Sequence, residues 1–161
     1  MRVLTLGDKL LREKSIPVPA VDDEIRKLID DMGRTMLAEN GLGLAAPQVG
    51  ELLRLFVCKI PEDDDVRVFI NPEIIETSER MVKYEEGCLS IPGLYAAVLR
   101  SERIILQAMN LYGKVFKIEA DGLLARVILH EFDHLNGKLF IDHLDDRKRE
   151  KLLKNYGGNR K

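Results

Sequence analysis

Apolar residues recur every three or four positions between residues 21 and 37, and this spacing predicts an amphipathic helix. Positions three and four apart share one face of a helix, so the apolar stripe would pack against a core. Acidic residues at positions 22 to 24 fall in the first turn, where the helix dipole favours negative charge. The stripe consists of Ile25, Leu28, Ile29, Met32 and Met36.

Five later segments have the composition of β-strands. Two of them, residues 52–60 and 66–75, flank a polar turn, which predicts an antiparallel hairpin. The acidic residues of that turn, positions 62 to 65, lack the spacing of a calcium-binding loop and are expected to face solvent. The other three strands are expected at residues 81–84, 102–109 and 114–119.

Two segments rich in glycine and proline, residues 41–50 and 85–93, are predicted to be shaped loops. Glycine lets the backbone approach a ligand or another segment closely. The first segment does not fit a phosphate-binding loop, because no Lys-Ser/Thr pair follows its glycines. Its one polar side chain, Gln48, is a candidate functional residue, although it could simply satisfy backbone groups in a packed connection.

The segment from Gly122 to Gly137 is predicted to be the second helix, with Asp121 as its cap and Gly137 as its stop. Residues 142–156 are expected to form a short basic helix, which the glycine pair at 157–158 would end. Strands that precede a late helix indicate an α+β fold. We expect antiparallel β-sheets packed around the second helix, with the amphipathic helix at the N-terminal end.

Length and composition narrow the class of protein. With 161 residues, 45% of them hydrophobic, a single domain spanning residues 1–161 is expected. A net charge of −2 and a pI near 6.0 argue against DNA as a partner, because phosphate binding needs a concentrated basic surface. The sequence shows neither a membrane span nor a signal peptide pattern, and two cysteines are too few for a disulfide framework. A cytoplasmic setting is therefore expected.

The predicted second helix carries the sequence His-Glu-Phe-Asp-His at residues 130–134. His130 and His134 are four positions apart, so they share one face and can bind one metal ion, with Glu131 beside them as a base. The simpler alternative is a pair of histidines that hydrogen-bond within the core. A third ligand would distinguish the two.

Three classes of metal site compete for this third position. The metzincin pattern requires a histidine where this chain has Phe140, which cannot bind a metal, so that class is excluded. A thermolysin-like protease takes a glutamate from a later helix, and Glu150 is the downstream candidate, in a segment expected to be solvated. Cys88 would complete a site of two imidazoles and one thiolate with a position open for water. Cys58 is expected in the core, and His143 at the surface or behind a ligand.

Three stretches together resemble the signature motifs of the peptide deformylase family, in that family's order and spacing. They are Gly-Leu-Gly-Leu-Ala-Ala-Pro-Gln at 41–48, Glu-Gly-Cys-Leu-Ser at 86–90, and the histidine motif at 130–134. The similarity extends over nearly the whole chain. It implies that Cys88, His130 and His134 bind one divalent metal ion, most often Fe(II), with Zn, Ni or Co able to replace it.

The activity that the resemblance implies is removal of the formyl group from the N-terminal formyl-methionine of newly made proteins, with release of formate. A divalent metal lowers the pKa of its bound water, and Glu131 can take the water's proton and pass it to the departing amine. The resemblance assigns the Gln48 side chain and the Leu89 backbone N–H to the oxygen that gains negative charge.

The resemblance also implies a binding site for the substrate. An extended chain end should add strand-like hydrogen bonds to the backbone of residues 41–44, which include Gly43 and Leu44, and of residues 87–91, which begin at Gly87. The chain departs from the family pattern at three positions near these contacts, Arg126, Leu129 and Tyr95. An apolar pocket for the methionine side chain would be lined by Leu42, Glu86, Leu123, Val127 and His130.

The basic segment at residues 145–161 allows two interpretations. It is expected to be a solvated helix face with a short tail, and the resemblance offers docking on ribosomal RNA as the alternative. A monomer is expected. Two other functions remain to be distinguished from deformylation, a small metalloprotease and a metal-dependent binding protein without catalysis.

Overall fold

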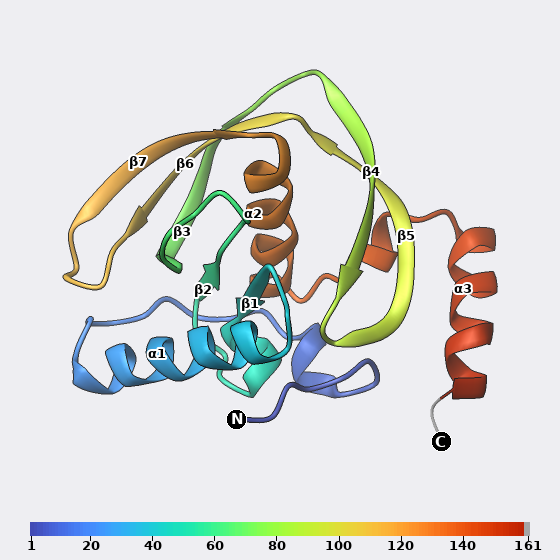
Figure 1. The fold of residues 1–161 in the computed structure, drawn as a ribbon, viewed down its shortest axis with the longest axis horizontal. Coiled ribbons are helices and arrows are strands. Elements are labelled where there is room, and N and C mark those ends of the chain that lie inside the picture. The colour runs from blue at the N-terminus through green and yellow to red at the C-terminus, as the bar shows by residue number, and fades with distance from the viewer. Residues whose placement is uncertain (160–161) are drawn as a thin grey trace.

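The computed structural model describes residues 1–159, and its central element is the helix α2 (Gly122–Leu135), which stands between two antiparallel sheets (Figure 1). The larger sheet has the strand order β1-β2-β3-β6-β7, and the smaller pairs β4 with β5. This arrangement confirms the predicted α+β fold. The larger sheet contains β1 (Gly43–Ala45), β2 (Leu55–Cys58), β3 (Arg67–Thr77), β6 (Arg103–Met109) and β7 (Val115–Asp121), and the smaller contains β4 (Met81–Cys88) and β5 (Ile91–Ser101).

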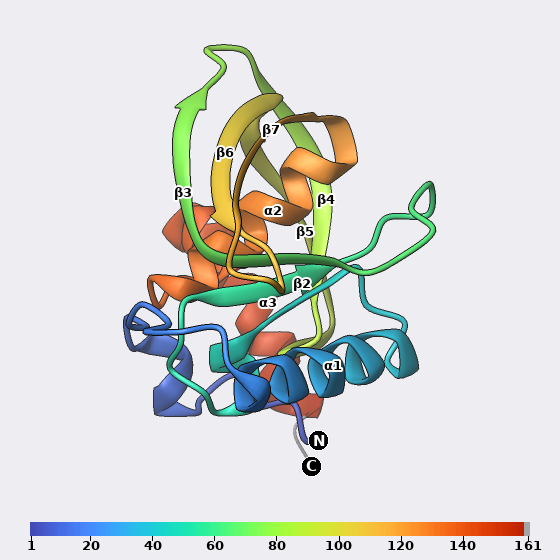
Figure 2. The same cartoon turned by 90° about the vertical axis from the view of Figure 1, so that its left-hand side faces the viewer.

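The N-terminal amphipathic helix is α1 (Asp23–Ala38), close to its predicted bounds. The Asp22 side chain caps it by accepting a hydrogen bond from the N–H of Ile25 at 2.9 Å. Its apolar stripe, with Met32 and Met36 fully buried, packs against β1 and β2. Figure 2 shows the helix running below β2. The helix therefore supports the strand that follows it, which forms part of the cleft described below.

The helix α2 packs by one side against the larger sheet, where Ala125, Ile128 and Leu135 are fully buried. Asp121 occupies the capping position, but its side chain makes no capping hydrogen bond, so that part of the prediction is wrong. Gly137 follows the last turn with φ of 72°, and a Cβ there would meet the carbonyl of Arg12. The helix thus ends close to the predicted stop, and this position requires glycine.

The predicted hairpin of residues 52–60 and 66–75 is present as β2 and β3, which pair from Leu55 with Ile70 to Cys58 with Arg67. The acidic turn between them contains Asp63, which holds Arg67 through two hydrogen bonds of 2.9 and 2.8 Å. The predicted strands at 102–109 and 114–119 are β6 and β7, which also pair with each other.

Two segments expected to be irregular contain regular structure. Residues 41–50 form β1 and a short 3-10 helix (Ala46–Val49), and β1 pairs with β2. Residues 85–93 belong to a hairpin, since β4 continues to Cys88 and β5 begins at Ile91. Strand β5, which runs on through residues 94–101, was not predicted. Proline is tolerated in β5 because each strand of a two-stranded sheet has a free edge.

The C-terminal segment forms a short 3-10 helix (Phe140–His143) and α3 (Asp146–Asn159). Leu152 and Leu153 of α3 pack against the cluster around β5 and Phe140. The helix continues through the glycine pair at 157–158, so the predicted end there is wrong, and residues 160–161 of the expected tail lie outside the described residues. Among residues 1–159, no helix has both the length and the apolar character needed to cross a membrane.

Candidate metal centre

Cys88, His130 and His134 converge between α2 and the end of β4. Their ligand atoms all lie within 4.8 Å of one another, and Cys88 Sγ is 3.4 Å from Nε2 of His134. The helix spacing of four residues places both imidazoles on the face that meets β4, where the turn into β5 presents the thiol. One sulfur and two imidazole nitrogens form a donor set that suits a divalent transition metal.

His130 is oriented by a buried carboxylate on β4. Its Nδ1 lies 2.9 Å from Oε1 of Glu86, and an ionised carboxylate can only accept, so Nδ1 carries a proton and Nε2 is the nitrogen that faces the centre. Burial opposes ionisation of Glu86, but hydrogen bonds from His130 and Arg100 outweigh it and lower the pKa of Glu86 to about 2. Such a partner behind a ligand histidine fixes the ring and its tautomer.

The other residues of the centre also shape its charge. Burial opposes protonation of His130, yet contacts with Cys88, Glu86 and Glu131 raise its pKa well above the usual value. The same negative groups that favour a proton on this ring would attract a metal cation. Burial lowers the pKa of His134, which favours the neutral imidazole that a metal ligand requires.

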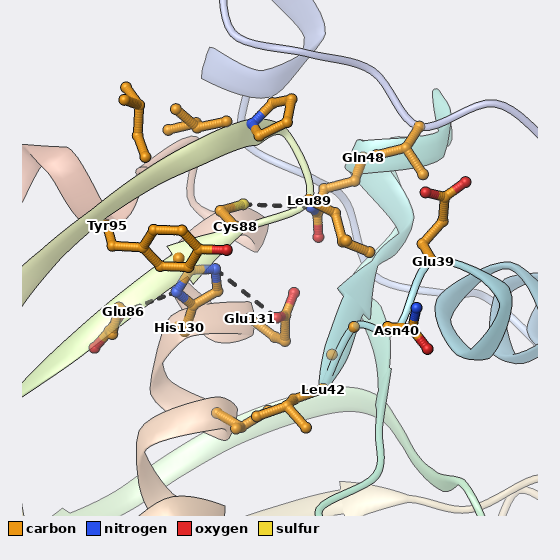
Figure 3. A pocket seen from close by; sticks show the side chains of 18 of the residues that line it. Glu39, Asn40, Leu42, Gln48, Glu86, Cys88, Leu89, Tyr95, His130 and Glu131 are labelled. Atoms are coloured by element: carbon orange, nitrogen blue, oxygen red, sulfur yellow. Dashed lines mark hydrogen bonds and ion pairs between the residues drawn. The ribbon is translucent and has the colours of Figure 1, made fainter. Parts of the chain in front are cut away.

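Glu131 lies on the opposite side of His130 from Glu86 (Figure 3). Its Oε2 is 3.9 Å from His130 Nε2, while Oε1 is buried and has no hydrogen-bond partner among the described residues. Burial raises the pKa of Glu131 to about 7. The backbone of β1 passes so close that a Cβ on Gly43 would lie 2.5 Å from Oε2. An orphaned buried carboxylate beside this donor set fits a site built to take a metal ion and its water.

Gln48, from the 3-10 helix after β1, reaches the same centre. Its Oε1 accepts a hydrogen bond from the N–H of Ala45 at 2.8 Å, which turns its amide nitrogen toward the hairpin. This Nε2 lies 3.1 Å from Ser90 Oγ and 3.6 Å from Cys88 Sγ. Leu89 lies with Ser90 in the turn between β4 and β5, and its side chain packs on Gly41. The two glycine-containing segments thus meet at the centre.

A cleft of about 930 Å³ opens in front of these residues. Of the residues predicted to bind substrate, Leu44 does not line it, because its fully buried side chain packs in the core around α1. Glu150 is exposed on α3 and is not among the described residues that line the cleft. The predicted residues that do line it are Leu42, Gly43, Glu86, Gly87, Leu123, Val127 and His130.

The charged network behind Glu86 was not predicted from the sequence. Arg100, on β5, donates to both carboxylate oxygens of Glu86 at 2.6 and 3.0 Å and to Asp133 at 2.9 Å. His143 is exposed, which agrees with the first of its two predicted positions, at the surface, and its Nε2 lies 2.7 Å from Asp133. The partners of Arg100 are 14 and 33 residues away in sequence, so no local pattern connected them.

The positions that depart from the family pattern have different surroundings. Arg126 lines the cleft and contacts Glu86, whereas Leu129 packs against the core around the larger sheet. Tyr95 is 62% exposed at the cleft, and its ring covers Gly87 so closely that a Cβ there would lie 2.5 Å from it. Cys58 is fully buried as expected, and burial raises the pKa of its thiol to about 12.

Comparisons with known proteins identify the family. The family model described as Polypeptide deformylase matches residues 1–150. A peptide deformylase of Treponema pallidum is 46% identical over 99% of this chain and 98% of its own length. One of Acinetobacter baumannii is 49% identical over 93% of this chain and 86% of its own.

Solved structures agree with the sequence relatives. The peptide deformylase of Ehrlichia chaffeensis in complex with actinonin superposes with a TM-score of 0.95 at 40% identity, covering all of this chain and 98% of that one. A peptide deformylase of Legionella pneumophila gives 0.93 at 42% identity, covering 98% and 93%. The resemblance of the three motifs is confirmed, and the deformylase function is supported over a protease or a binding protein. The chain belongs to the polypeptide deformylase family.

Proposed function

We propose that this enzyme removes the formyl group from the N-terminal formyl-methionine of newly made proteins with one divalent metal ion held by Cys88, His130 and His134. The observation that carries the proposal is the convergence of these three ligand atoms within 4.8 Å, beside the buried carboxylate of Glu131. When bound, the ion would lower the pKa of a water molecule and polarise the formyl oxygen. We propose Fe(II) as the metal in the cell, with Zn, Ni or Co as replacements.

In this proposal Glu131 moves the protons. Its carboxylate accepts a proton as the water oxygen bonds to the formyl carbon, and then delivers that proton to the nitrogen as the C–N bond breaks. The products are formate and a free amino terminus. Burial supports the role, because a carboxyl group with a pKa of about 7 is able both to accept and to return a proton near neutral pH.

Gln48 and Leu89 are proposed to stabilise the formyl oxygen as it gains negative charge. The Gln48 amide is held by the N–H of Ala45, so its nitrogen is oriented before substrate arrives. Leu89 lies next to Cys88 in the turn and would contribute its backbone N–H. Preorganised donors of this kind cost no reorganisation during the reaction.

The substrate is proposed to enter as an extended chain between β1 and the β4–β5 turn. Residues 41–43 and residues 87–89 with Ile91 line the cleft, and Leu44, whose side chain is buried, would contribute through its backbone alone. The methionine side chain would contact Leu42, Leu123 and Val127. Because both oxygens of Glu86 are already engaged, this pocket offers no free carboxylate to a polar side chain.

Formate release from a formyl-Met peptide by the iron-loaded protein tests the activity. Cys88→Ala, with metal content measured by elemental analysis, tests the ligand set, and Cys58→Ala is the matched control. We expect loss of metal and of formate release in Cys88→Ala alone. Full metal occupancy in that variant would exclude Cys88 as a ligand, and cleavage of internal peptide bonds would favour a protease.

We also propose that the enzyme acts as a monomer in the cytoplasm, close to the ribosome. Support for the ribosome contact comes from Lys83, Lys148 and Lys151, which line one groove between β4–β5 and α3. Replacing Lys148 and Lys151 with glutamine should weaken cosedimentation with ribosomes. Unchanged cosedimentation would leave α3 as a solvated helix without this role.

A further inference from the structure

The side chain of Arg126 is buried beside the cleft, and its guanidinium makes three hydrogen bonds to the smaller sheet. Nη1 donates to Oε2 of Glu86 at 2.6 Å and to the carbonyl of Val98 at 2.9 Å, and Nη2 donates to the carbonyl of Val82 at 2.6 Å. The guanidinium carbon also lies 5.6 Å from the centre of the Tyr84 ring. One side chain of α2 therefore contacts both strands of the β4–β5 hairpin.

Arg126 is linked to a proposed metal ligand through Glu86. It precedes His130 by four residues, so the two side chains share one face of α2. The carboxylate of Glu86 lies between them, with Oε2 on Arg126 and Oε1 on Nδ1 of His130. Arg100 holds the same carboxylate from β5. Glu86 is thus fixed by two arginines and cannot turn away from His130 without breaking their hydrogen bonds.

The position of Arg126 matters because the ligands come from two separate elements. Cys88 ends β4, whereas His130 and His134 lie on α2, and β4 pairs only with β5 within the described sheets. Contacts between α2 and the hairpin therefore help to set the distance between the thiol and the imidazoles. The hydrogen bonds of Arg126 to Val82 and Val98 join the helix to this hairpin one turn before His130.

We propose that Arg126 is a positioning residue of the metal centre. It holds Glu86 against His130, and it fixes the β4–β5 hairpin, which contains Cys88, against α2. The inference rests on the proposed ligand set. The guanidinium geometry matters, because the three acceptors are reached from two separate nitrogens of one rigid plane, whereas an ammonium group has its three donors on a single nitrogen. The alternative role is contact with the substrate side chain, since Arg126 also lines the cleft.

The test compares Arg126→Met and Arg126→Lys with wild type, and with Arg103→Met as the control. Arg103 is matched because it also pairs with a glutamate, Glu119 at 3.2 Å, but on an exposed surface away from the cleft. Zn(II) affinity is measured on the metal-free protein by competition with a chromophoric chelator. The visible spectrum of the Co(II) form and the separate values of kcat and KM for a formyl-Met peptide are the further measurements.

A positioning role predicts Zn(II) binding about 10- to 100-fold weaker in Arg126→Met, the range for residues behind metal ligands. The Co(II) spectrum should shift, kcat of the metal-saturated enzyme should fall more than KM rises, and Arg126→Lys should be intermediate. Arg103→Met should match wild type. If Arg126→Met does not fold, Arg126→Lys carries the same comparison.

Unchanged Zn(II) affinity and an unchanged Co(II) spectrum in a folded variant would overturn the inference, and a rise in KM alone would assign Arg126 to substrate contact. Cys88→Ala separates this failure from failure of the ligand set. If Cys88→Ala binds Zn(II) as tightly as wild type, the ligand set is wrong; if only the Arg126 variants do, the positioning role is wrong.

Discussion

Glu86 and Glu131 are both buried glutamates, one on each side of His130, yet their surroundings are opposite (Figure 3). Glu86 accepts from His130 and from two arginines, and its pKa falls to about 2 despite burial. Glu131 has an oxygen without a partner among residues 1–159, and burial raises its pKa to about 7. Glu86, whose oxygens all have hydrogen-bond partners, can hold His130 in place. Glu131, which has an oxygen without a partner, can exchange a proton.

The difference arises from the elements that supply partners. Glu86 faces β5 and the arginine-bearing face of α2, which surround it with guanidinium groups. Glu131 faces the glycine of β1, where no side chain is available to bond it. Burial alone therefore does not determine the pKa of an acid in this protein. Hydrogen bonds and basic neighbours outweigh burial at Glu86, whereas burial outweighs the nearby His130 at Glu131.

The largest effect is expected when Glu131 loses its ability to carry a proton. Glu131→Gln should lower kcat by roughly 10²- to 10⁴-fold while metal content stays at the wild-type level. Steady-state formate release and elemental analysis measure the two quantities, with Glu119→Gln on β7 as an exposed control. Near wild-type turnover would remove Glu131 from the mechanism.

Gln48→Glu tests the donor across the cleft from this pair. The new carboxylate can still accept from the N–H of Ala45, but it has no N–H to offer the formyl oxygen. We expect kcat to fall about 10²-fold, the loss that follows removal of one oxyanion donor. A kcat within a factor of two of wild type would mean that the Gln48 side chain only stabilises the 3-10 helix.

Glu86→Gln would weaken the hydrogen bonds that join Glu86 to His130 and the two arginines. The amide is a poorer acceptor for His130, and it leaves Arg126 without a negative partner and Arg100 with Asp133 alone. Metal affinity should fall about tenfold or more, as for other groups that orient ligand histidines. Chelator competition measures it, and Glu73→Gln on β3 is an exposed control. Equal affinities for the two variants would contradict the orienting role.

The smallest effect is expected at Asp63, a paired acid that lies outside the cleft. Its hydrogen bonds with Arg67 lower the pKa of Asp63. The pair therefore stabilises the fold at pH values above the ordinary pKa of aspartate, and this contribution is lost as the pH falls through the lowered pKa. Asp63→Asn should cost about 1 kcal/mol at pH 7, because Arg67 is 39% exposed and water screens the pair. Denaturant unfolding should show the difference shrinking as the pH falls below the ordinary pKa of aspartate. A constant difference would exclude ionisation as its source.

Local patterns in the sequence were sufficient for the parts of the site that lie on one element. The spacing of His130 and His134 on a helix and the apolar stripe of α1 depend on residues within a few positions. The role of Cys88 required the resemblance, because the alternatives were still open on chemical grounds. Its hairpin was mistaken for a loop, since glycine and proline disfavour strands except at edges such as those of β4 and β5.

The charged network escaped prediction for a different reason. Arg100 and Arg126 lie 14 and 40 residues from Glu86 in the chain, so no periodicity connects them. An arginine in a helix or strand is usually exposed, and tertiary packing alone reveals that these two are buried. The predicted end of α3 was also wrong. The glycine pair suggested a stop, and the packing of Leu152 and Leu153 against the rest of the protein cannot be predicted from the local sequence.

The origin of the proposed ligands in two elements has a thermodynamic consequence. Cys88 and His134 are 46 residues apart, so the unfolded chain does not hold them together. An ion that binds only the assembled centre adds to the free energy of unfolding by mass action, about 4 kcal/mol at a free concentration a thousand times its Kd. Such a contribution is a large part of the stability of an ordinary domain. An enzyme molecule that loses its ion would then become an easier substrate for proteases, and metal supply would set how long each molecule survives.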